Sequence, residues 1–173
     1  MSSWNKIFKP IVVLSVICIV ITGALALTNN VTKPIIEEAT RKAQDAARLE
    51  LLPEADSFTK VEGIAVANVS DVYTANNGVG AVVTSSAKGY GGTMTVMVGF
   101  TADGTIRQIK VTEQAETKGI GSKVAGDPAF WTRYEGVKAE LPVEVDALSG
   151  ATISSKALNA AVNSAVEAYN AMG

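Results

Sequence analysis

An uncharged apolar run near the N-terminus constrains the fold of this chain more than any other feature. Residues 10–28 read PIVVLSVICIVITGALALT and contain no Asp, Glu, Lys or Arg. As an α-helix the run would be about 28 Å long at about 1.5 Å per residue, close to the hydrocarbon thickness of a bilayer. We therefore predict a transmembrane helix over residues 10–28.

The charges that precede this run predict its direction across the membrane. Lys6 and Lys9 lie just before it, and cytoplasmic flanks are enriched in basic residues. We expect residues 1–9 in the cytoplasm and the rest of the chain outside. A cleaved signal peptide is the alternative, because the Ala-Leu-Ala at 24–26 resembles a small-residue cleavage site. We favour a retained, single-pass anchor in the cell membrane.

The composition argues against several classes of function. The 173 residues include 15 Lys and Arg against 17 Asp and Glu, a net charge of -2, so no basic excess favours nucleic-acid binding. The chain has no histidine, the commonest metal ligand and general base. Its one cysteine, Cys18, lies in the apolar run, where we expect it to face lipid or another helix without binding a metal. Redox chemistry would therefore need an organic cofactor.

The rest of the chain predicts an α+β fold on a helical stalk, residues 29–56. Apolar positions recur at helical spacing over residues 31–52, with Pro34 near the expected first turn and Pro53 after the end. Residues 57–173 are predicted to form a small domain with an antiparallel sheet and a C-terminal helix over 153–172. Segments rich in Val, Ile and Thr predict its strands over residues 58–66, 69–73, 79–85, 94–100 and 106–112.

Residues 113–129, EQAETKGIGSKVAGDPA, form the least regular part of this domain. They hold too many glycines for a stable helix, and long irregular loops in compact domains are often functional. The aromatic residues that follow, Phe130, Trp131 and Tyr134, are expected to pack in the core. The earlier KGYGG at 88–92 lacks both the Gly-Lys-Ser/Thr ending and the following helix of a phosphate-binding loop.

The segment DALSGAT at residues 146–152 directly precedes the predicted final helix. Ser149 is expected to cap that helix through its hydroxyl. Gly150 and Ala151 permit close backbone approach, Thr152 adds a hydroxyl, and N–H groups at a helix start bind phosphate. The residues alone leave two interpretations open: an ordinary helix cap, or a site for a phosphorylated planar ligand whose ring lies against residues 116–121.

Two motifs carry a specific resemblance. DALSGAT resembles the Asp-x-x-Ser/Thr-Gly-Ala-Thr signature of proteins that carry FMN on a threonine through a phosphoester bond. ETKGIG, residues 116–121, resembles the Glu-Thr-Pro-Gly-Leu-Gly loop of the same FMN-binding domain. With its anchor and stalk, the chain resembles the G subunit of Rnf-type ion-translocating electron transport complexes. It is similar to the C subunit of the sodium-pumping NADH:quinone reductase, which is usually longer.

The resemblance assigns roles to individual residues. It implies covalent FMN on Thr152, with the phosphate end shaped by Ser149, Gly150 and Ala151. Contacts to the ribityl chain or the isoalloxazine are expected from Glu116, Thr117, Gly119, Ile120 and Gly121. Lys118 stands where the family usually has proline. It either reaches the flavin and favours the anionic reduced form or lies in solvent, and we favour the solvated placement. No catalytic residue and no metal ligand is implied.

The resemblance also implies an electron-relay subunit and not a stand-alone enzyme. The family's complex couples ferredoxin oxidation to NAD+ reduction and moves sodium ions or protons. Implied partners are a second covalent-flavin subunit, iron–sulfur subunits and a flavin transferase that recognises Asp146. The alternatives are a membrane-anchored extracytoplasmic binding or scaffold module without a redox cofactor, and a hydrolase with Ser149 or Thr152 as nucleophile. The hydrolase lacks an evident base.

Overall fold

The computed structural model describes residues 8–173, which form two compact units divided between Asp45 and Ala46. The first unit contains most of helix α1 (Lys9–Leu51). An 18-residue stretch of this helix has a mean hydropathy of 2.8, and none of it is buried within the chain. Length and composition therefore fit a single membrane span, as the sequence predicts.

Helix α1 is one continuous helix, and the prediction of a separate stalk helix that starts near Pro34 was wrong. Pro34 lies inside α1, although a proline removes one backbone N–H donor. The Asn-Asn pair at 29–30 contains neither glycine nor proline to end the first helix, and the Thr28 hydroxyl donates to the Ala24 carbonyl at 2.9 Å. The helix therefore continues through the predicted junction.

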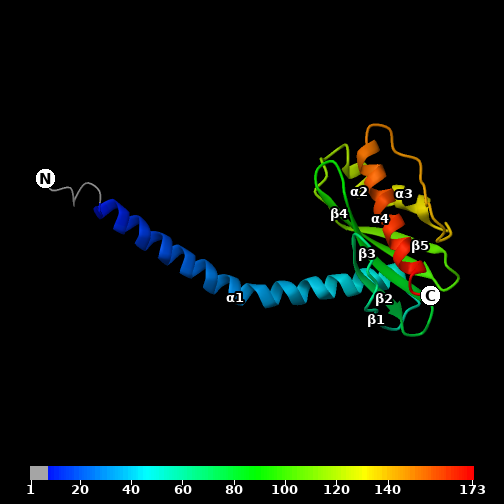
Figure 1. The fold of residues 1–173 in the computed structure, drawn as a ribbon, viewed down its shortest axis with the longest axis horizontal. Helices are drawn as coiled ribbons and strands as arrows, with labels where there is room; N and C mark the ends of the chain where they lie inside the picture. Colours follow the sequence, from blue (N-terminus) through cyan, green and yellow to red (C-terminus); the bar gives the residue numbers. More distant parts are fainter. Residues whose placement is uncertain (1–7) are drawn as a thin grey trace. The chain divides into compact units, whose positions relative to one another are not determined.

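The second unit holds a five-stranded antiparallel sheet in which each strand pairs with the next along the chain (Figure 1). The first strand is shorter than predicted, because Gly63 adopts a left-handed φ of +89° and residues 61–66 leave the sheet. The other four confirm the predictions with small changes at their ends. The strands are β1 (Phe58–Lys60), β2 (Val69–Ala75), β3 (Gly80–Lys88), β4 (Thr93–Thr101) and β5 (Ile106–Glu113).

Helix α4 (Thr152–Asn170) packs on one face of this sheet, against β2, β3 and β4 (Figure 1). Its apolar stripe is buried as predicted, with Leu158 and Val162 both 0% exposed. The short helices α2 (Ser122–Ala125) and α3 (Pro128–Trp131) and the 3-10 turn Thr132–Tyr134 extend the same core. Phe130 and Tyr134 are buried there, which confirms the predicted packing of the aromatic cluster.

A smaller core contains the end of α1. Leu51 and Leu52 pack with Val82 and Met97 from the sheet. Side chains alternate between the two faces of a strand, and the neighbours of Val82 and Met97 belong to the α4 core, so this second core lies on the opposite face. The sheet is thus covered on both sides.

Replacing Leu51 with alanine should destabilise the second unit. Leu51 is 0% exposed, and truncating a buried leucine typically costs about 2–5 kcal/mol of unfolding free energy. Leu49→Ala is the matched control, because Leu49 is 45% exposed on the same turn. Urea unfolding of the full chain in detergent, followed by near-ultraviolet circular dichroism, measures both. Equal losses in the two variants would contradict the assigned core.

Candidate functional site

The DALSGAT segment forms a tight turn that leads into α4. Gly150 has a φ of +82°, a left-handed conformation that favours glycine. The Ala151 N–H donates to the Leu148 carbonyl at 2.9 Å. The Ser155 hydroxyl accepts from the Leu148 N–H at 3.1 Å and donates to the Ala151 carbonyl at 3.0 Å. A side chain one turn into the helix therefore holds this turn.

The prediction that Ser149 caps the helix was wrong. Ala151 occupies the cap position, and among residues 8–173 no side chain accepts from the N–H groups of the first turn. The left-handed Gly150 inserts a turn between Ser149 and the helix. The first-turn N–H groups thus lack both intrahelical partners and a side-chain cap, which leaves them available to an anion.

A pocket of about 380 Å³ opens at this helix start. The Thr152 side chain is exposed there, and within residues 8–173 its hydroxyl makes no hydrogen bond. Three large apolar side chains border the pocket and are themselves exposed: Tyr90 by 70%, Ile120 by 53% and Ile153 by 55%. The pocket therefore combines an accessible hydroxyl, free N–H groups and apolar walls.

The loop 116–121 supplies one wall of the pocket. The N–H groups of Ile120 and Ser122 both donate to the Thr117 carbonyl at 3.3 Å. Gly119 is left-handed at φ +82°, and its N–H donates to the Ser122 hydroxyl at 2.9 Å. This turn places Ile120 at the pocket. Lys118 is exposed in the same turn.

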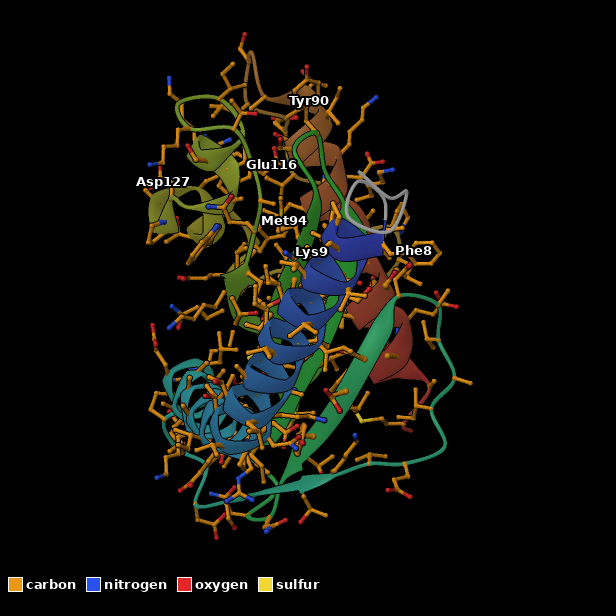
Figure 2. All side chains as sticks on the ribbon, turned by 90° about the vertical axis from the view of Figure 1, so that its left-hand side faces the viewer. Phe8, Lys9, Tyr90, Met94, Glu116 and Asp127 are labelled. Carbon is orange, nitrogen blue, oxygen red and sulfur yellow. The ribbon has the colours of Figure 1, made fainter. Side chains whose placement is uncertain are left out.

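Glu116 lies behind the pocket wall and not on its surface. The residue is only 8% exposed. Its Oε2 accepts from the Ser154 hydroxyl at 2.9 Å, and both of its oxygens lie 3.4 Å from the Gly91 nitrogen. Figure 2 shows Glu116 at the same end of the domain as Tyr90. The carboxylate therefore contacts one residue that lines the pocket, Ser154, from the inner side.

The structure brings together part of the residue set predicted from sequence. The predicted residues that line the pocket are Ile120, Gly150, Ala151 and Thr152. The predicted residues outside the lining are Glu116, Thr117, Gly119, Gly121 and Ser149. Sequence reasoning missed Tyr90, Ile153 and Ser154. The sequence does contain a signal for Tyr90. An aromatic residue between the glycines of KGYGG is expected to have an exposed side chain, and exposed aromatic side chains can contact a ligand.

Comparison with known proteins identifies the family. Residues 89–167 match the model of the FMN-binding domain, and residues 1–51 match that of the RnfG N-terminal region. The G subunit of the Na(+)-translocating ferredoxin:NAD(+) oxidoreductase complex of Acetobacterium woodii is 34% identical over 192 residues, covering 96% of this chain and 93% of that protein. The chain belongs to the RnfG family, the G subunits of ion-translocating oxidoreductase complexes.

A second relative supports this assignment, and one solved structure shares the fold alone. The G subunit of the proton-translocating ferredoxin:NAD(+) oxidoreductase complex of Clostridium ljungdahlii is 30% identical over 175 residues, covering 94% of this chain and 91% of that protein. The crystal structure of Shewanella oneidensis NqrC shares the fold, with a TM-score of 0.52 and 20% identity over 70% of this chain and 72% of that chain.

In this RnfG-family chain, two asparagines of α4 hold the extended segment that leads to DALSGAT. The Asn163 amide donates to the Val143 carbonyl at 2.7 Å and accepts from the Val143 N–H at 2.8 Å. Asn159, one turn earlier, pairs in the same way with Val145, at 2.9 and 3.4 Å. Each amide thus satisfies both backbone groups of a residue on the segment. The segment runs antiparallel to α4 and reaches the pocket at the helix start.

The buried Tyr134 completes this arrangement. Its hydroxyl donates to the Asn159 side-chain oxygen. Burial raises the pKa of the Tyr134 phenol well above its usual range, so the group stays neutral and keeps its proton for this bond. The Asn159 side chain is therefore held by Tyr134 from the core while it binds the backbone of Val145.

Replacing Asn163 with leucine should destabilise the segment that carries the site. Val143 is 2% exposed, and each backbone group left without a partner there costs about 1–3 kcal/mol. The measurement is a thermal unfolding curve of the full chain in detergent. Glu167→Leu, an exposed position one turn later on α4, is the control and should change the midpoint little. An Asn163→Leu chain as stable as this control would refute the role of the amide.

Proposed function

We propose that this chain carries FMN covalently on Thr152 through a phosphoester bond and relays electrons between other subunits of its complex. Membership of the RnfG family makes the chain a membrane electron-transfer subunit of an Rnf-type complex. The observation that supports the attachment site is the exposed Thr152 hydroxyl, without a partner among the described residues, at a helix start whose N–H groups have no side-chain cap.

The pocket fits the chemistry of FMN. Its volume of about 380 Å³ lies within the range of small-molecule sites. The N–H groups and positive dipole end of α4 suit a phosphate. The apolar side chains of Tyr90, Ile120 and Ile153 suit a flat aromatic ring system. When bound, FMN supplies the electron-carrying chemistry that the side chains of this chain lack.

Attachment would need a flavin transferase with FAD as its co-substrate. The Thr152 Oγ attacks the phosphorus on the FMN side of the FAD pyrophosphate, and the bond from that phosphorus to the bridging oxygen breaks. AMP leaves with the bridging oxygen, and the hydroxyl proton passes to solvent. The exposure of Thr152 gives a second protein access to this oxygen. Asp146 is exposed six residues earlier and would contact the transferase.

The complex around this protein would exchange electrons between ferredoxin and NAD+ and move ions across the membrane, with a second covalent-flavin subunit and iron–sulfur subunits as partners. The relatives from Acetobacterium woodii and Clostridium ljungdahlii are named as parts of sodium- and proton-translocating complexes, respectively. Lys6 and Lys9 favour a cytoplasmic N-terminus and an extracytoplasmic flavin domain. A covalent bond there keeps the cofactor from diffusing away.

The test is denaturing gel electrophoresis under ultraviolet light, on full chain produced with a flavin transferase. We expect a fluorescent band for the parent and for Thr152→Ser, which keeps the hydroxyl, and none for Thr152→Val. Thr117→Val changes an exposed threonine on the facing loop and should remain fluorescent.

Fluorescence in Thr152→Val would move the attachment to another residue. A dark parent, with the transferase active on a known substrate, would refute covalent flavinylation. The mass of the proteolytic peptide that contains Thr152 provides the second measurement, because the parent peptide should be heavier by one attached FMN.

A further inference from the structure

Glu116 is a buried carboxylate whose partners are all neutral. Its hydrogen bonds come from the Ser154 hydroxyl and the Gly91 N–H. Within residues 8–173 it forms no ion pair. Burying a carboxylate without a cation costs free energy. Residues that depart from the rule that buried charges are paired are often functional. We therefore looked for a role of Glu116 other than stabilising the fold.

Two glycines make room for this carboxylate. A Cβ on Gly89 would lie 1.9 Å from the Glu116 Oε1, and a Cβ on Gly121 would lie 2.0 Å from Oε2 and 2.8 Å from the Ser154 Oγ. Real Cβ atoms essentially never lie within 3.0 Å of such a heavy atom, so a side chain at either position would displace the carboxylate. The backbone of two segments, at Gly89 and at Gly121, thus encloses the carboxylate and holds it in one position.

The tip of the β3–β4 hairpin packs closely on the residue before Glu116. A Cβ on Gly91 would lie 2.3 Å from the Ala115 carbonyl oxygen, and one on Gly92 would lie 2.8 Å from the Ala115 Cβ. The hairpin tip therefore lies directly against residues 115–116. Tyr90, which borders the pocket, lies between these glycines.

Three segments that border the pocket meet at this one carboxylate. The hairpin tip carries Tyr90, the loop 116–121 carries Ile120, and the first turn of α4 carries Thr152. We propose that Glu116 is a positioning residue that holds the flavin pocket closed by joining the hairpin tip to the first turn of α4. This inference rests on the proposed function, and it replaces the direct flavin contact that the family resemblance implies for Glu116.

Iodide quenching of the covalent flavin tests the proposal. Iodide quenches flavin fluorescence on collision, so the quenching constant reports how open the pocket is. The full chain, flavinylated on Thr152 and kept in detergent, is compared with its variants. The covalent bond holds the cofactor in place, so each constant reports pocket opening and not loss of flavin.

Glu116→Ala should raise the quenching constant several-fold, because the hairpin tip and α4 lose their shared partner. Glu116→Gln keeps an acceptor oxygen for Ser154 and should stay near the parent. Ser154→Ala should open the pocket, and the double variant Glu116→Ala/Ser154→Ala should be no more open than Glu116→Ala, since both changes remove the same contact. Glu113→Ala removes an exposed carboxylate nearby and is the control.

A parental quenching constant in Glu116→Ala would overturn the proposal, as would a Glu116→Gln chain as open as Glu116→Ala. Additive rises in the double variant would overturn it too. If Glu116→Ala fails to fold, as judged by loss of a cooperative thermal transition, Ser154→Ala decides, and an unchanged constant there refutes the proposal. A parent without covalent flavin overturns the proposed function itself, which the gel reveals before any Glu116 variant is made.

Discussion

The packing of α4 on the sheet is the interaction on which the site depends. The helix buries an apolar stripe against β2, β3 and β4, and this burial fixes where its first residue, Thr152, lies. The hairpin that faces Thr152 joins β3 to β4, two of the strands beneath this helix, and the facing loop follows β5, which pairs with β4. A hydrophobic interface thus places side chains that are far apart in the sequence at one pocket.

Most of the helices and strands could be predicted from the sequence, because the spacing of apolar residues and the local composition indicate them. Apolar residues at every second position from 94 to 100, alternating with Thr and Gly, predicted β4, and the helical stripe of residues 153–172 predicted α4. The membrane segment needed only the absence of charge over residues 10–28. These signals are strong since each repeats along a single element.

The errors occur where a local rule competes with tertiary contacts. Ser149 satisfies the rule for a helix cap, but the backbone at Gly150 turns away and Ser155 supplies the bond that fixes the turn. Glu116 was predicted as a contact to the cofactor, and the glycines that surround it enclose its carboxylate behind the pocket wall, a placement that no local pattern specifies. Tyr90 lies 62 residues before Thr152 in the chain, and only the fold brings it to the pocket. No local pattern specifies such long-range placement.

The amide pairs between α4 and the segment before DALSGAT have a consequence for how the family can vary. Asn159 and Asn163 hold Val145 and Val143 through the backbone groups of these valines, whose side chains turn toward the core. The intervening Glu144 and the following Asp146 are exposed. The identity of these two side chains is thereby separated from the bonds that hold the segment, so the surface that they form can diverge between lineages while Thr152 keeps its place at the start of α4.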